Sequence, residues 1–265
     1  MPQLERNPDS DSNTPDPRWS SLYKVSGAAA LIAVLIFRRW LGEEFLLLRS
    51  LGIIHIGPRA LPSSVIDWFT LLHTHRIIGL TLLNVFDLVN YALVGLMFLG
   101  LYAALRRVNR SYMTLAMALG TVGIAVYFAS NQAFSMLSLS EQYASATTDA
   151  QRSVLLAAGQ ALLAISNTGV FGQTAMSFLF VNLAGLIISV VMLRSCIFGK
   201  ASAYVGILAN GFGLGYPVGL ILAPKVLVIA VISLSASACF LVIWYIQIAR
   251  RLFQLGYGKP HGSAS

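Results

Sequence analysis

The stretch IIGLTLLNVFDLVNYALVGLMFLGLYAAL, residues 77–105, decides the fold class of this protein. Its only charged residue is Asp87. A hydrocarbon core about 30 Å thick needs about 20 apolar residues in a helix that rises 1.5 Å per residue. Residues 77–105 exceed this length, so they are predicted to form a transmembrane helix that tilts or protrudes from the membrane.

The rest of the chain has the same apolar character. Of its 265 residues, 57% are hydrophobic and 11% are charged, whereas soluble domains contain about 25% charged residues. Apolar runs recur along nearly the whole chain, which predicts one all-α bundle integral to the membrane. We expect six transmembrane helices, at residues 22–37, 77–105, 112–137, 168–193, 201–222 and 226–248.

Two further apolar stretches, residues 45–56 and 154–165, are about 12 residues long and too short to span. They are predicted to be interfacial or re-entrant helices on the outer side, and the sequence leaves both alternatives open. The tetrapeptide TDAQ, residues 148–151, has the capping-box pattern that satisfies the first free amides of a helix. We therefore expect a helix that begins near Asp149.

The ends of the chain differ from the six-span domain, which we place at residues 20–256. Residues 1–19 contain four acidic residues and four prolines. A signal peptide would begin with basic residues and continue with apolar ones, so this segment is predicted to be a disordered polar tail. The first span then serves as an uncleaved anchor, and residues 257–265 form a short C-terminal tail.

The chain has a net charge of +8, and the positions of its Lys and Arg residues are informative. They gather at the ends of apolar runs, where positive charge sets membrane orientation, and this placement argues against nucleic-acid binding. With a cytoplasmic N-terminus, eleven of them lie inside, and the short outer loops contain only Arg152 and Lys225. The first outer loop, residues 38–76, departs from this rule with five arginines. We expect a multi-pass plasma-membrane protein with both termini in the cytoplasm.

Asp87 is the first candidate for a functional role. If the span begins near Ile77, Asp87 lies roughly 15 Å deep, near the middle of the membrane. Asn84 and Tyr91 share its helical face, and Asn90 lies close beside it. One interpretation is a proton, cation or ligand site; the other is a set of polar residues that hold helices together.

Three further residues are candidates for the same intramembrane polar site. Asn131 is expected at the outer boundary of the third span. Gln173 and Ser177 are expected in the outer half of the fourth. These side chains could line one outward-facing pocket with Asp87, but polar residues at such positions more often link helices.

The sequence NGFGLGYPVG, residues 210–219, weakens the fifth span. Pro217 removes a helical hydrogen bond, and a break at membrane depth is tolerated only against protein or a water-filled cavity. The alternative is that small residues let neighbouring helices approach closely. A dinucleotide-binding fingerprint is excluded, because the glycine spacing is wrong and no strand precedes it. The candidate break residues are Asn210, Gly211, Gly213, Gly215 and Pro217.

Signals for catalysis or metal binding are weak. No Ser, His and acid combination has a recognisable spacing, and a GxSxG elbow is missing. The histidines of HTHR, residues 73–76, are two positions apart and would point to different faces of a helix. Cys196 and Cys239 belong to no CxxC motif. We therefore expect no enzyme, no catalytic residue, no metal and no cofactor.

Three runs carry a resemblance to a known family: residues 131–152 (NQAFSMLSLSEQYASATTDAQR), 182–210 (NLAGLIISVVMLRSCIFGKASAYVGILAN) and 244–256 (WYIQIARRLFQLG). They resemble prokaryotic multi-span membrane proteins grouped as domain of unknown function 4386. The resemblance covers roughly residues 20–256. It implies a helical membrane fold without an assigned activity, so no catalytic or ligand residues come with it.

Two functions follow as expectations. The favoured one is a non-catalytic sensing, stabilising or assembly component that contacts the lipid bilayer and a membrane partner or a second copy of itself. The alternative is a small-molecule or ion transporter or channel with an outward-facing polar pocket around Asp87. The transporter alternative fails if Asp87 and Asn131 face separate dry interfaces that no cavity reaches.

Overall fold

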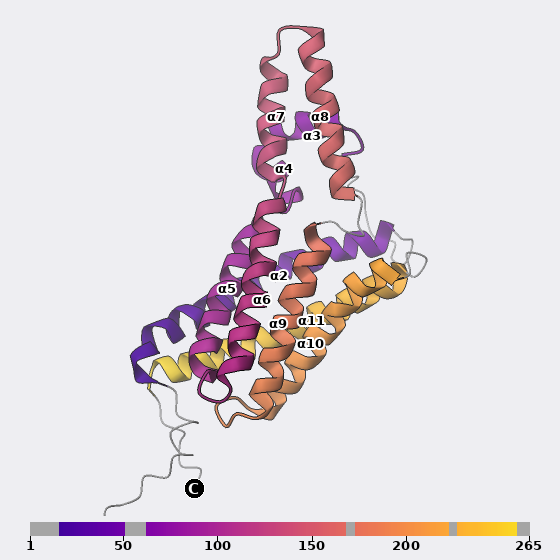
Figure 1. Cartoon of the computed structure of the whole chain (residues 1–265). Coiled ribbons are helices and arrows are strands. Elements are labelled where there is room, and N and C mark those ends of the chain that lie inside the picture. The colour runs from indigo at the N-terminus through magenta and orange to yellow at the C-terminus, as the bar shows by residue number, and fades with distance from the viewer. Residues whose placement is uncertain (1–15, 51–61, 168–172, 223–226, 259–265) are drawn as a thin grey trace, which may run out of the picture.

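The computed structural model describes residues 16–50, 62–167, 173–222 and 227–258. The regular structure of these residues is helical, which confirms the expected all-α fold (Figure 1). The helices are η1 (Pro17–Trp19, a 3-10 helix), α2 (Ser20–Ser50), α3 (Val65–Thr74), α4 (Arg76–Leu82), α5 (Val85–Leu105), α6 (Arg110–Ser130), α7 (Ala133–Ser145), α8 (Asp149–Asn167), α9 (Gln173–Leu193), α10 (Lys200–Leu222) and α11 (Leu227–Gly256).

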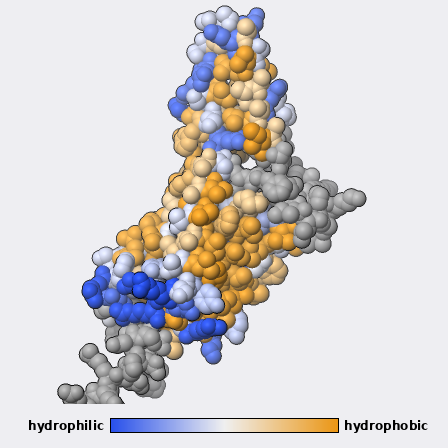
Figure 2. Space-filling view, viewed as in Figure 1, coloured by the Kyte–Doolittle hydropathy of each residue, from blue (hydrophilic) through white to orange (hydrophobic). Residues whose placement is uncertain are grey.

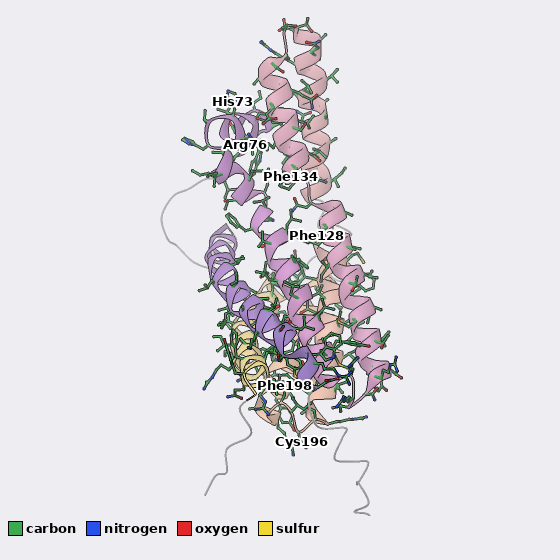
Figure 3. The ribbon with its side chains drawn as sticks, turned by 90° about the vertical axis from the view of Figure 1, so that its left-hand side faces the viewer. His73, Arg76, Phe128, Phe134, Cys196 and Phe198 are labelled. Carbon is green, nitrogen blue, oxygen red and sulfur yellow. The ribbon has the colours of Figure 1, made fainter. Side chains whose placement is uncertain are left out.

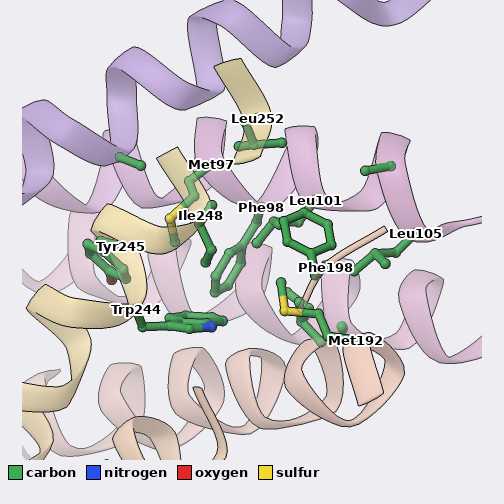
Figure 4. Packing of buried hydrophobic residues seen from close by; sticks show 14 of the residues in the cluster. Met97, Phe98, Leu101, Leu105, Met192, Phe198, Trp244, Tyr245, Ile248 and Leu252 are labelled. Carbon is green, nitrogen blue, oxygen red and sulfur yellow. The ribbon is translucent and has the colours of Figure 1, made fainter. Parts of the chain in front are cut away.

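Six helices form a closed ring. Going around it, α5 packs on α6, α6 on α9, α9 on α10, α10 on α11, α11 on α2, and α2 again on α5. In Figure 1, α2 and α11 run obliquely to the other four. The interior is filled by large side chains, among which Leu101, Met192 and Ile248 are completely buried (Figure 4).

The outside of the ring is apolar. Leu35, Val89 and Leu115 point outward with 68%, 50% and 49% of their surface exposed, and Figure 2 shows a broad hydrophobic surface over this part of the molecule. An apolar surface of this extent is typical of contact with lipid. Four helical stretches are long and apolar enough to cross a membrane: α5, α6 with α7 (Arg110–Ser145), α9 from Ala175 to Leu193, and α11 from Ile232 to Gly256.

The described residues therefore contain four candidate spans rather than the six that the sequence predicted. In α2, the apolar stretch among the residues whose side chains are described, Ser20–Ile36, is shorter than a membrane span. The helix α10 is long enough, but it is not among the apolar candidates.

The helices α3, α4, α7 and α8 form a second unit, which we call the distal module. It extends from one end of the ring, and α7 and α8 make an antiparallel hairpin within it (Figure 1). Its own apolar cluster includes Trp68, Phe69 and Met136. The Ser140 hydroxyl donates to the Phe69 carbonyl at 2.9 Å and fixes α7 on α3. Figure 3 shows His73 and Arg76 on this module, far from Cys196 and Phe198 at the opposite end.

The predicted helix over residues 77–105 is interrupted. The helix α4 ends at Leu82, and α5 begins at Val85. Between them, Asn84 has a φ of 60°, a left-handed conformation that Asn adopts more readily than most other residues. Asp87 therefore lies in the first turn of α5, which corrects its expected position ten residues inside a continuous helix.

A second interruption follows α6. The predicted helix over residues 112–137 ends at Ser130, and α7 starts at Ala133. The side chain of Asn131 turns the chain here, because its Oδ1 accepts the Ala133 N–H at 3.0 Å. Both described connections between the ring and the distal module therefore contain a helix break at an asparagine.

The helix expected near Asp149 does begin there. The Thr148 hydroxyl accepts the Gln151 N–H at 3.2 Å, as a capping box requires. The expected interfacial helix over residues 154–165 is part of this longer helix, and it pairs with α7 instead of lying alone. Of the other expected interfacial helix, residues 45–50 continue α2, and the remainder lies outside the described residues.

The opposite end of the ring is basic, and we call it the basic end. Figure 2 shows a hydrophilic patch there. Asp16, which the sequence assigned to the tail, accepts the Arg18 N–H at 3.1 Å and pairs with Arg107 at 3.3 Å. These contacts, the Arg18 N–H foremost, hold the pKa of Asp16 below its usual value. Other Lys and Arg residues of this end include Lys24, Arg106, Arg110, Arg194, Lys200, Arg250 and Arg251.

We predict that acid weakens the start of α3. The Ser64 hydroxyl accepts the Asp67 N–H at 3.1 Å, and the carboxylate accepts the Ser64 N–H at 3.0 Å. Hydrogen bonds to the carboxylate, from the Ser64 side chain first and from the Ser64 N–H next, hold the pKa of Asp67 below its usual value. A lowered pKa in the folded state adds stability above the unperturbed value of about 3.9, and this stability is lost as the pH falls through the folded pKa.

Hydrogen exchange of the α3 amides measures this effect. At pH 7, α3 should exchange more slowly in the wild type than in Asp67→Asn, and the difference should vanish below about pH 4. The amides of α10 provide the internal control, because this helix packs on α9 and α11 and should exchange equally in both proteins. A difference between the two proteins that does not depend on pH would contradict the prediction.

Candidate functional site

A cavity of about 50 Å³ lies inside the ring, between α5, α9, α10 and α11. Along α5 its lining runs from Asp87 to Phe98, a distance of about 16 Å at 1.5 Å per residue. One water molecule needs about 10–15 Å³ of such space, so the cavity has room for a few waters or one small ligand. The polar part of its lining consists of Asp87, Asn90, Tyr91, Asn182, Asn210, Trp244 and Tyr245.

Asp87 is the only carboxylate in the lining of the cavity. The Tyr127 hydroxyl of α6 donates to Asp87 Oδ2 at 3.1 Å. The Tyr91 ring stacks on the Tyr127 ring, with 4.1 Å between their centroids and 9° between their planes. The hydrogen bond from Tyr127 therefore fixes the position of the Asp87 carboxylate at the cavity. Charges interact more strongly in such a site than in water, because the surrounding dielectric constant is lower.

Two buried polar groups of the cavity have no hydrogen-bond partner among the described residues. They are Asn90 Oδ1, an acceptor, and Trp244 Nε1, a donor. The two residues are only 8% and 1% exposed. A buried polar group without a partner costs about 1–3 kcal/mol, so such groups are rare in proteins. A polar ligand in the cavity would relieve this cost, which makes the pair a sign of a binding site.

Asparagine and glycine residues alternate across the contact between α9 and α10. Asn182 of α9 lies against Gly213 of α10, and Asn210 of α10 lies against Gly185 of α9. Each side-chain amide donates to the main-chain carbonyl four residues earlier, at 2.8 and 2.7 Å. A Cβ atom on either glycine would lie 2.6 Å from the facing asparagine Cγ. The glycines therefore make room for the two amides at the wall of the cavity.

The predicted break in the fifth span is not observed. The helix α10 continues from Lys200 to Leu222 with Pro217 inside it. Its glycines instead serve close packing, the other alternative that the sequence left open. Gly213 faces Asn182 and Gly215 faces Ser233, whereas Gly211 faces open space.

Three serine hydroxyls link neighbouring helices of the ring. Ser26 of α2 donates to the Leu96 carbonyl of α5 at 2.6 Å. Ser177 of α9 donates to a carbonyl of α6 at 2.8 Å, and Ser237 of α11 to one of α10 at 2.7 Å. Such hydrogen bonds stabilise helix contacts in membranes by about 0.6–2 kcal/mol each. Ser177 thus has a structural contact that accounts for its polarity.

The cavity brings together only part of the predicted site. Asp87, Asn90 and Tyr91 line it, as their spacing on one helix suggested. Asn84 is exposed at the first helix break, and Asn131 is half-buried at the second. Ser177 lies at the contact of α6 and α9, and the side chain of Gln173 lies outside the described part of the chain.

Sequence reasoning missed Trp244 and Tyr245. Both are buried, at 1% and 6% exposure, and both face the cavity from α11. Adjacent aromatic residues in an apolar helix are also typical of lipid anchors, so the pattern alone did not single them out. Asn210 was expected only as part of a helix break, although it belongs to the cavity wall.

No protein-family model matches this chain, and neither a curated protein nor a solved structure matches it. The resemblance to domain of unknown function 4386 therefore stays an expectation from the sequence. What the described residues establish is a multi-helix protein with four candidate membrane spans.

We predict that Gly185→Ala and Gly213→Ala each destabilise the protein. The added Cβ atom must displace an asparagine side chain that is buried and hydrogen-bonded, which costs about 1–3 kcal/mol. Gly211→Ala is the matched control, because a Cβ atom there meets no neighbour. It should be neutral, or stabilising by up to about 1 kcal/mol.

Thermal unfolding of the purified variants in detergent tests this prediction. The Tm should fall for Gly185→Ala and Gly213→Ala and should stay or rise for Gly211→Ala. Equal Tm values for the three variants would show that the asparagine contacts do not constrain the α9–α10 distance.

Proposed function

We propose that this chain is a non-catalytic, multi-pass membrane protein that senses a small monovalent cation by binding it in the cavity beside Asp87. One observation carries the proposal: the cavity combines a carboxylate with an unpartnered acceptor, Asn90 Oδ1, and an unpartnered donor, Trp244 Nε1. If the polar residues of the lining only linked helices, Asn90 Oδ1 and Trp244 Nε1 would be expected to have hydrogen-bond partners within the protein.

The chemistry of the lining favours a positively charged ligand. Asp87 supplies negative charge, and Asn90 Oδ1 supplies a further acceptor close by on the same helix. Tyr91, Trp244 and Tyr245 add aromatic rings, which attract cations that approach their faces. The cavity volume of about 50 Å³ limits the ligand to the size of an alkali ion, ammonium or a small alkylammonium ion. Trp244 Nε1 can donate to a water that accompanies the ion.

The ring supports the expectation of six spans. The helices α2 and α10 each pack between two candidate spans and complete the closed ring, so they lie at the same level as the others. We propose that both cross the membrane, with α2 using its tilt and its extension to Ser50 to reach the far side.

Charge supports the expected orientation. The Lys and Arg residues of the basic end lie in the short loops and near both chain ends, and positive loops face the cytoplasm in most membrane proteins. We therefore place the basic end and both termini in the cytoplasm of a plasma-membrane protein. The distal module and the Asp87 end of the cavity then face outward. The expected membrane partner or second copy stays a prediction.

Transport is the second candidate function. The carboxylate lies at the start of α5 and the cavity extends deeper into the ring, as an outward-facing binding site would. Toward the basic end the cavity meets the packed cluster that includes Met97, Leu101 and Met192. A transporter would have to open this packing in a second state, whereas a sensor would not.

A thermal-shift titration of the full chain in detergent tests the binding proposal. Sodium, potassium, ammonium, methylammonium and choline chlorides are compared at equal ionic strength. At least one small cation should raise the Tm of the wild type, and Asp87→Asn should weaken that binding by about tenfold or more, because it removes the charge. Asp67→Asn is the matched control, since it removes an exposed carboxylate of the distal module.

Asn90→Leu and Trp244→Phe test the same site without changing its charge. Replacing an unpartnered buried polar group by an apolar one of similar shape is nearly neutral or stabilising. Asn90→Leu should therefore keep the Tm of the free protein, whereas Trp244→Phe removes part of a buried ring and should lower it. Both variants should lose part of the cation-induced shift. The binding proposal is contradicted if no cation shifts the Tm, or if Asp87→Asn and Asp67→Asn respond alike.

Flux measurements separate the two candidate functions. If the protein is a sensor, proteoliposomes that contain it take up the cation no faster than empty vesicles. Uptake that depends on Asp87 would replace the sensing proposal by transport through the same site.

A further inference from the structure

A groove of about 230 Å³ lies between α6 and α9 near the basic end, apart from the cavity inside the ring. Its walls are mostly apolar and include Ile187 and Val190 of α9. Val190 is 42% exposed, so the groove opens on the outer surface of the ring. Both helices are candidate membrane spans, which places this surface against lipid.

One end of the groove is polar. Arg194, directly after α9, and Asn109 and Tyr112, at the start of α6, lie there. Arg194 is exposed, and no described acidic side chain pairs with it. The start of a helix also adds partial positive charge from its free N–H groups. The positive charge at this end can attract an anion, and Tyr112 adds an amphipathic ring of the kind enriched at membrane interfaces.

We infer that this groove binds one anionic phospholipid from the leaflet at the basic end. An acyl chain lies along Ile187 and Val190, and the phosphate group contacts Arg194. A free phosphate ion would use only the polar end and leave the apolar walls uncovered. A zwitterionic lipid would bring a second positive charge close to the arginines of the basic end. An anionic phospholipid complements both the walls and the charge.

Such a lipid would stabilise the contact between α6 and α9. The hydrogen bond from Ser177 to the Gly123 carbonyl fastens these two helices nearer the distal module. The groove separates them nearer the basic end. A bound acyl chain fills the groove and adds apolar packing to the core contacts that Met113 and Val191 already make there.

Native mass spectrometry of the full chain in detergent tests the inference. The wild type is incubated with phosphatidylglycerol or with phosphatidylcholine of the same acyl chains. Phosphatidylglycerol should bind with one tight site, and Arg194→Gln should weaken this site by about tenfold or more. Arg250→Gln is the matched control, because Arg250 is an exposed arginine of the same end that does not line the groove.

A second pair of variants tests the apolar walls. Val190→Trp fills the groove and should also weaken phosphatidylglycerol binding, while Ile243→Trp changes a residue of similar exposure (45%) elsewhere on the ring and should not. Soluble glycerol phosphate in excess should not displace the lipid. The inference is overturned if Arg194→Gln and Arg250→Gln bind alike, if Val190→Trp binds as the wild type does, if phosphatidylcholine binds equally well, or if glycerol phosphate competes.

Discussion

The ring depends on one constraint: polar groups inside an apolar bundle must find their partners within the protein, because lipid offers none. Ser26, Ser177 and Ser237 each donate to a carbonyl on the next helix. The amides of Asn182 and Asn210 donate to carbonyls of their own helices and fit against glycines of the facing helix. These contacts set how closely neighbouring helices approach, and the aliphatic and aromatic core fills what remains.

Four buried side-chain atoms of the described residues do not meet this constraint: Tyr23 Oη, Asn90 Oδ1, Trp244 Nε1 and Gln247 Oε1, and two of these residues, Asn90 and Trp244, line the cavity. Asn90 Oδ1 and Trp244 Nε1 stay without partners on its walls, although the same bundle satisfies the serines and the other asparagines. These two exceptions lie beside Asp87, the one carboxylate of that lining. The proposed binding site rests on this combination of a carboxylate with two unpartnered groups in one lining.

Hydropathy predicted the helical class and most helix positions, because the apolar length of a segment follows directly from its composition. The start of α8 near Asp149 and the grouping of Asp87, Asn90 and Tyr91 were also predictable, since capping and helical spacing are local. The breaks at Asn84 and Asn131 were not, because one backbone angle, φ at Asn84 and ψ at Asn131, leaves no trace in an apolar pattern. The α10 glycines face Asn182 and Ser233, and this arrangement depends on tertiary packing. The sequence alone was therefore compatible with either a helix break or a close contact.

One helix break lies close to Asp87 along the chain, and the other lies close to its partner Tyr127. Asn84 precedes Asp87 by three residues, and Asn131 follows Tyr127 by four. The Asp87–Tyr127 hydrogen bond therefore bridges α5 and α6 about one turn from the joint of each helix. If the distal module tilted at these joints, the tilt would strain that hydrogen bond, and a cation that drew the carboxylate away from Tyr127 would free the same two joints. Under the proposed function, the orientation of the distal module and the occupancy of the cavity would therefore be coupled through one hydrogen bond.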